Sequence, residues 1–227
     1  MFIIKKLIDI FACEDTTFFS LLSIFQHFFC YFCAMNVNIH THHPKNGERT
    51  LSTVGIHPYD AEGANSDMLF SIERRATHFD AIGEIGLDFF CSVDKEQQIL
   101  IFQAQLEIAQ KVGKGVVLHC VKSFEKVMEI LKNYSLKFVI FHGFIGSPEQ
   151  AKRATDRGYF LSFGERTFRS PKSIEAMKNI PTELLFFETD ESAVDIDEIY
   201  SKASDILGIP ELVLKYITNE NFERVCG

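Results

Sequence analysis

From residue 35 onward, short apolar runs alternate with longer segments in which apolar residues recur every three or four positions. The short runs are typical of strands buried on both faces, and the periodic segments are typical of helices that cover a sheet. Residues 95–112 show the helical pattern most clearly, because Phe102, Leu106 and Ala109 share one face and Gly113 follows as a stop signal. This alternation predicts repeated strand–helix units around a parallel sheet.

Seven segments have the composition and length of strands: residues 36–40, 51–56, 79–89, 115–118, 138–141, 159–163 and 184–189. Seven strands are one fewer than a complete (β/α)8 barrel has, and the span 35–227 is shorter than the roughly 250 residues typical of that fold. We therefore expect an α/β fold, a TIM-barrel-like (β/α) barrel reduced to about seven strands.

The link between the first two predicted strands is unusual. Residues 43–50 contain the turn formers Pro44, Asn46 and Gly47, and they are too few for a crossover helix. Either these two strands are not parallel neighbours, or their connection is irregular.

Residues 1–34 differ from the rest and hold eight of the 23 phenylalanines. The nearly uncharged run 18–34 is at the short limit for a membrane span, and Glu14 and Asp15 separate it from Lys5 and Lys6, unlike in a signal peptide. Three interpretations remain open: translation starts at Met35, the segment is a membrane or export leader, or it packs on the core. The domain organisation is therefore an extension, 1–34, before a single barrel, 35–227.

Charge and cysteines limit the function. The net charge of −8 argues against a broad electrostatic grip on nucleic acid. Of the six cysteines, only Cys30 and Cys33 form a CxxC pair, and neither a second ligand pair nor a redox fold context accompanies it. Reduced thiols predict a cytoplasmic protein. No stable protein partner is implied, and we do not expect residues 35–227 to enter a membrane.

Metal-type ligands stand at or near the ends of the apolar runs. A carboxylate such as Glu84 inside a buried strand needs a cation beside it, and His40 and His42 alternate so that both rings point to one face. In a barrel, the ends of the strands meet at one mouth. The candidate metal ligands are His40, His42, Glu84, His119, His142 and Asp190. Alternatively, Glu84 is a buried structural acid, and single histidines such as His27, His43 and His78 are interpreted as structural.

These residues carry a family resemblance: the chain resembles the TatD family of metal-dependent deoxyribonucleases, within the amidohydrolase-like barrel superfamily. The matching motifs are His40-Thr41-His42, Gly55-Ile56-His57-Pro58, Gly83-Glu84-Ile85-Gly86-Leu87-Asp88, the helix with Gln98, Phe102 and Ala109, His119, His142-Gly143-Phe144-Ile145-Gly146-Ser147, and Glu188-Thr189-Asp190. They cover nearly all of the chain from Met35.

The resemblance implies a barrel of the metal-dependent hydrolase type with two divalent ions, Zn, Mn or Mg. One ion would be held by His40, His42 and Asp190, and the other by His119 and His142. Glu84 would bridge them. The implied reaction is hydrolysis of phosphodiester bonds in DNA by a water that the ions activate, with Glu84 and Asp190 as the catalytic carboxylates. We expect His57 and Lys122 to face the substrate phosphate; the alternative is that they are a loop histidine and a solvated lysine.

The chain also departs from the family pattern. Asn38 replaces the usual Asp before the histidine pair and cannot raise imidazole basicity as a carboxylate would. Val121 stands where an Arg is usual, which leaves the neighbouring Lys122, and the segments after the histidine pair and after Asp190 are short. The alternatives to a DNase are hydrolysis of a small phosphate ester or amide in the same site, and a non-catalytic barrel.

Overall fold

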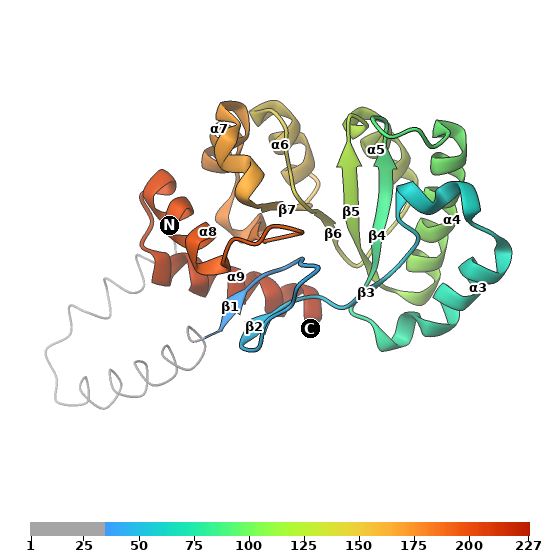
Figure 1. Ribbon diagram of the computed structural model, residues 1–227, viewed down its shortest axis with the longest axis horizontal. Coiled ribbons are helices and arrows are strands. Elements are labelled where there is room, and N and C mark those ends of the chain that lie inside the picture. The colour runs from blue at the N-terminus through green and yellow to red at the C-terminus, as the bar shows by residue number, and fades with distance from the viewer. Residues whose placement is uncertain (1–34) are drawn as a thin grey trace, which may run out of the picture. The chain divides into compact units, whose positions relative to one another are not determined.

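The computed structural model describes residues 35–227, so the predictions for 1–34 lie outside the described residues (Figure 1). Its strands are β1 (Asn36–Val37), β2 (Glu48–Arg49), β3 (Thr53–Val54), β4 (Ala81–Asp88), β5 (Gly115–Val121), β6 (Val139–Phe141), β7 (Phe160–Phe163) and β8 (Leu185–Phe187). Strands β3 to β8 form one parallel sheet in chain order, and β1 pairs with β2 in parallel. Parallel pairing in chain order is the arrangement that the alternating pattern predicts.

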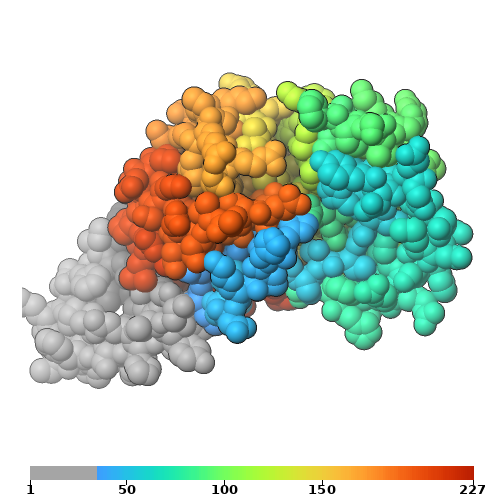
Figure 2. All heavy atoms as spheres, viewed as in Figure 1, coloured from blue at the N-terminus to red at the C-terminus, as the bar shows by residue number. Residues whose placement is uncertain are grey.

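Backbone hydrogen bonds also connect the last strand to the first segment of the barrel. The N–H of Ile39 donates to the carbonyl of Phe187 at 3.0 Å, and Asp190 exchanges backbone hydrogen bonds with His40 and His42. The space-filling view shows this first segment (blue) against the one after β8 (orange) (Figure 2). Strands β2 and β3 belong to one extended stretch, 48–54, that pairs with β1 and then with β4. Seven extended segments therefore form the circuit, as predicted.

The link between β1 and β2 was expected to be irregular unless the two strands were not neighbours. The two strands are parallel neighbours, with Asn36 opposite Glu48, and the chain returns between them without a helix. The connection is therefore irregular, and Gly47 supplies a backbone conformation with φ +88° that favours glycine. The second strand lies at 48–54 rather than at 51–56, because its pairing with β1 begins before the apolar residues do.

Helices pack against the sheet. They are α3 (Ser66–Arg75), α4 (Lys95–Val112), α5 (Phe124–Ile130), α6 (Pro148–Thr155), α7 (Pro171–Asn179), α8 (Ile196–Leu207) and α9 (Glu211–Cys226), with short 3-10 turns including η1 (Pro58–Gly63). Helix α4 has the predicted bounds, and Gly113 ends it in the left-handed conformation. Within residues 35–227, no helix combines the length and the apolar character that crossing a membrane requires.

Alternate residues of the strands pack into two different apolar clusters. Leu118 and Phe141 pack in the larger cluster with the helices, whereas Val117, Ile140 and Phe186 pack in a second cluster with Phe222 and Val225 of α9. Successive side chains of a strand alternate between faces, so the second set points into the barrel. Two residues further along the same strands, the next inward positions are His119, His142 and Glu188.

Candidate metal centre

The structure brings all six predicted ligands together at the C-terminal ends of the strands. His40 and His42 follow β1, Glu84 and His119 lie within β4 and β5, and His142 and Asp190 follow β6 and β8. This is the end of a (β/α) barrel at which functional groups gather.

Glu84 lies at the middle of the cluster, with its side chain only 10% exposed. Its Oε1 atom is 3.0 Å from Nε2 of His40 and 3.2 Å from Nε2 of His42. Its Oε2 atom is 2.8 Å from Nε2 of His142 and 3.9 Å from Nδ1 of His119. Asp190 Oδ1 lies 3.5 Å from Nε2 of His42, on the Oε1 side. Each carboxylate oxygen of Glu84 therefore faces its own pair of imidazoles.

Glycine allows this close approach of β4 to β5. The pairing of the two strands shifts register between Ile82 and Ile85, around Glu84. Gly86 has φ +138°, and a Cβ atom there would lie 2.0 Å from the backbone oxygen of His119. Any other residue at position 86 would push the strands apart and move Glu84 away from His119.

Two further carboxylates orient the histidines on the Oε2 side. Asp88 Oδ2 is 3.1 Å from Nε2 of His119, and Glu188 Oε1 is 3.3 Å from Nδ1 of His142. Such contacts fix which ring nitrogen faces a metal and raise its basicity. Neither residue was predicted to have a role at the site, although the alternation along β8 places Glu188 inside the barrel two residues after Phe186.

Charge interactions inside the cluster are strong. Burial disfavours protonated His142, but the carboxylates of Glu188 and Glu84 outweigh burial and raise its pKa to about 10. Burial would likewise raise the pKa of Glu84, yet the hydrogen bond from His142 holds that pKa below its usual range. Burial is the largest influence on Asp190 and raises its pKa. A carboxylate-rich cluster that draws a proton onto a buried imidazole is one that attracts cations.

The residues present fit a metal centre. Nε2 of His40 is buried and has no hydrogen bond of good geometry within the described part of the chain, although Glu84 Oε1 is nearby. Three sets of ligand atoms each lie within 4.8 Å of one another: His40, His42 and Glu84; His40, His142 and Asp190; and His57, Glu84 and His119. Mixed imidazole and carboxylate donors suit divalent metals such as Zn and Mn.

Lys122 lies at the same mouth and has an unusual backbone. It directly follows β5, is exposed, and has φ 53°, while Asp190 has φ 54°. These are the two non-glycine residues with positive φ in the described chain. Such conformations are strained and concentrate at functional sites. No contact in the structure tests the predicted role of Lys122 toward a substrate phosphate.

Asn38, two residues before the histidine pair, makes its side-chain hydrogen bonds to residues other than the histidines. It donates from Nδ2 to Thr189 Oγ1 and to Glu48 Oε2, both at 2.9 Å, and its Oδ1 accepts from the N–H of Thr189. Asn38 therefore ties the first strand to the segment after the last one. The effect of this residue on metal affinity stays a prediction.

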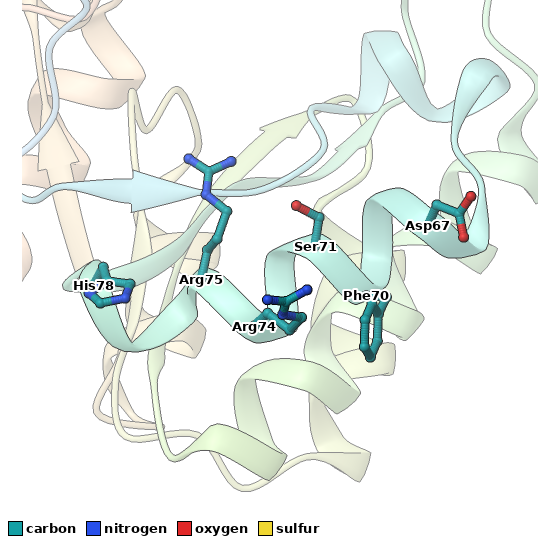
Figure 3. Close-up of a pocket in the computed structure, with 6 residues that line it drawn as sticks. All are labelled: Asp67, Phe70, Ser71, Arg74, Arg75 and His78. Carbon is teal, nitrogen blue, oxygen red and sulfur yellow. The ribbon is translucent and has the colours of Figure 1, made fainter.

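A surface hollow of about 530 Å³ lies apart from this cluster, along the outer face of α3 (Figure 3). It is lined by Asp67, Phe70, Ser71, Arg74, Arg75 and His78, all exposed and none of them a candidate ligand. His78, interpreted as structural from the sequence, belongs to this surface.

Comparison with known proteins agrees with this geometry. A family described as TatD related DNase matches residues 28–227. A TATDN1 homolog from Vairimorpha ceranae is 32% identical over 161 residues, which cover 67% of this chain and 56% of that protein. The 3'-5' ssDNA/RNA exonuclease TatD of Erwinia tasmaniensis is 34% identical over 61% of this chain and 57% of its own length. The chain thus spans little more than half of these relatives.

The solved structures support the fold. A TatD homolog from Escherichia coli K12 superposes with a TM-score of 0.71 at 24% identity, over 80% of this chain and 78% of that one. A hydrolase TatD family protein from Entamoeba histolytica gives a TM-score of 0.70 at 22% identity, over 79% of this chain and 75% of that one. Both agree with a TIM-barrel-like architecture.

Proposed function

This chain belongs to the TatD family of DNases, and from that premise we propose that it is a divalent-metal-dependent hydrolase that cleaves phosphodiester bonds of DNA. The observation that carries the proposal is the position of Glu84, whose two carboxylate oxygens face separate pairs of imidazoles. A single structural acid would need only one basic partner. Two sets of ligands on either side of one carboxylate suit a pair of ions.

The chain's residues divide between two ions as follows. His40, His42 and Asp190 lie on the Oε1 side of Glu84 and would hold the first ion, and His119 and His142 lie on the Oε2 side and would hold the second. Paired ions stabilise the attacking and leaving oxygens of a phosphodiester and make water more acidic. Zn, Mn and Mg remain the candidates.

The remaining roles follow from position and charge. Asp190 Oδ1 lies 3.5 Å from Nε2 of His42, on the Oε1 side of Glu84, and we assign this carboxylate the role of orienting the attacking water or accepting its proton. Lys122 would bind a substrate phosphate as a point charge from the end of β5. The cytoplasmic location inferred from the cysteines stays a prediction.

A second candidate activity is hydrolysis of a small phosphate ester or amide in the same site. The net charge of −8 weakens the attraction for a long polyanion, and the short link after β1 leaves less surface around the mouth to bind one. The two candidates share the metal centre and differ in substrate size.

The test combines metal analysis with a substrate screen. The purified full chain is analysed for metal, stripped with chelator, and reloaded with Zn, Mn or Mg. Each form is then assayed on end-labelled single- and double-stranded DNA and on small phosphate esters and amides. We expect metal-dependent DNA cleavage that Asp190→Asn abolishes. Cleavage of small substrates alone would support the second candidate, and a protein that binds no divalent ion would refute both.

A further inference from the structure

Two exposed aromatic side chains lie on the rim of the candidate metal centre. Within residues 35–227, the exposed phenylalanine and tyrosine side chains are Tyr59, Phe70 and Phe90, and Phe90 is the most open of them at 81%. Phe70 lies on α3, with the guanidinium of Arg74 5.8 Å from its ring centroid. Tyr59 and Phe90 instead lie in the loops that follow β3 and β4, at the end of the sheet that carries the candidate ligands. One exposed aromatic residue is ordinary on a protein surface, but two beside one site indicate a binding surface.

Tyr59 contacts the centre through its histidines. Its ring centroid is 4.4 Å from that of His57 and 5.8 Å from that of His119, both in edge-on geometry. The ring of His57 in turn lies 4.5 Å from that of His119. Because Tyr59 is 55% exposed, part of its ring contacts these imidazoles while the remainder faces solvent at the mouth. A group held on the Oε2 side of Glu84 therefore has Tyr59 as a neighbour.

One carboxylate connects Phe90 with the same side of the centre. Asp88 Oδ2 is 3.1 Å from Nε2 of His119. Its other oxygen, Oδ1, accepts hydrogen bonds from the N–H of Phe90 at 2.8 Å and from the N–H of Cys91 at 3.1 Å. Hydrogen bonds of this kind, from an Asp to the backbone two and three residues on, fix a turn. The side chain that orients a candidate metal ligand thus also holds the backbone of Phe90 beside it.

Helix α4 fixes both loops. Gln97 Nε2 donates to the carbonyl of Ala61 in η1 at 3.1 Å. Gln98 Nε2 donates to the carbonyl of Asp88 at 2.9 Å, two residues before Phe90. Consecutive residues of one helix therefore hold the two loops in position relative to each other. A surface that is ordered in advance loses less conformational entropy when a ligand binds.

Exposed aromatic rings beside a phosphodiesterase centre suit a nucleobase. Aromatic side chains stack on any base, and this contact does not depend on net charge. Stacking therefore suits a chain of net charge −8, which cannot rely on neutralising many phosphates. We propose that Tyr59 and Phe90 form a stacking platform for the nucleobase next to the phosphate at the metal centre, an inference that rests on the DNA hydrolase function proposed above. A base inside a duplex has both faces covered by its neighbours, so the platform takes a base of a single strand or a frayed end.

The test uses variants that lose the rings but keep apolar side chains. They are Phe90→Leu and the double variant Tyr59→Leu/Phe90→Leu, with Phe70→Leu as the matched exposed aromatic control on α3. Phe90→Tyr retains a ring. The metal-loaded full chain is assayed for kcat/KM on a single-stranded oligonucleotide and on an abasic oligonucleotide of the same length, which keeps the phosphates but lacks the bases. Metal content and a melting curve are measured for each protein.

We expect the double variant to cleave the base-bearing strand about 5- to 150-fold less efficiently than the wild type, the range for loss of one stacked base. The abasic strand should be cleaved equally by both proteins. Phe90→Leu should show part of the same loss, and Phe90→Tyr and Phe70→Leu none. Unchanged cleavage of the base-bearing strand by the double variant, or equal losses on both strands, overturns the inference and leaves the proposed function intact. A wild type that cleaves neither strand with any of the metals refutes the DNA hydrolase function, and the inference with it.

A second measurement needs neither cleavage nor a substitution. A short single strand carrying 5-iodouracil is photocrosslinked to the metal-stripped full chain, and the adducts are mapped by mass spectrometry. We expect adducts on Tyr59 or Phe90 and none on Phe70. A pattern of adducts that omits both rim residues overturns the inference.

Discussion

Replacing Glu84 with Ala should remove bound metal from both positions at once. In the structure, its Oε1 faces His40 and His42, and its Oε2 faces His119 and His142. Without it, two divalent cations would face each other with neutral imidazoles between them and with Asp190 as the one remaining carboxylate among the six ligands. We expect the metal content to fall by more than one ion per chain.

The magnitude can be estimated from the contacts. Loss of a residue that only contacts a metal ligand lowers metal affinity about 10–100-fold. Loss of a direct ligand should lower the affinity by at least as much, or roughly 1.4–2.7 kcal/mol for each ion. The metal-free protein should also be less stable, because loss of one partner of a buried ion pair costs about 3–5 kcal/mol. For a chain of this size that is a fall in Tm of roughly 6–20 °C.

The assay is metal analysis after dialysis against a limiting free-ion concentration, with a melting curve of each metal-free protein. His119→Ala provides the comparison, because it should empty mainly the second position while His40, His42, Glu84 and Asp190 keep the first. Glu84→Gln tests charge, since it retains shape and one carbonyl oxygen. A Glu84→Ala protein that still carries two ions per chain would refute the bridging role, and a lower Tm with unchanged metal would make Glu84 a structural acid.

Three further predictions concern separate parts of the chain. Lys122→Ala should reduce activity about tenfold or more while the metal content stays that of the wild type, and metal loss alongside activity would contradict a substrate-binding role. His142, whose pKa is raised to about 10 from the usual 6.5, should stabilise the metal-free protein fully below pH 6.5 and progressively less as the pH rises through 10. Because its proton must leave when metal binds, the affinity for the second ion should rise with pH over that interval. Melting curves in zinc-free buffer and zinc titrations, each at several pH values, test the two trends. Removal of residues 1–34 should leave a protein that unfolds cooperatively on heating, and aggregation of the shortened chain alone would indicate that the extension packs on the barrel.

The gathering of the candidate ligands at one mouth was predictable, because it depends mainly on where each apolar run ends. A parallel sheet in a barrel brings all strand ends to one mouth, so His119, His142 and Asp190 meet whatever the detailed register is. The seven-strand circuit follows from the same alternation of apolar runs and helical segments.

The contacts around the ligands were not predictable, because they depend on pairing that has no sequence period. The register shift between Ile82 and Ile85 sets the height of Glu84 in the barrel. The pairing of Asp88 with His119 depends on how the side chains of adjacent strands meet. The hydrogen bond from Asn38 to Thr189 also spans 151 residues of sequence, and no local pattern predicts it.

The junction between the first and last strands has a consequence for folding. Asp190 pairs with Thr41 at a separation of 149 residues, and this contact joins the proposed ligands of the first ion, which come from both ends of the circuit. Contacts this distant in sequence carry a large loop-closure entropy and tend to form late. The second position draws on β4, β5 and β6, which are consecutive. Metal should therefore be able to enter the second position of a partly folded chain. Metal uptake at the first position should instead require that the last strand has already paired with the first segment.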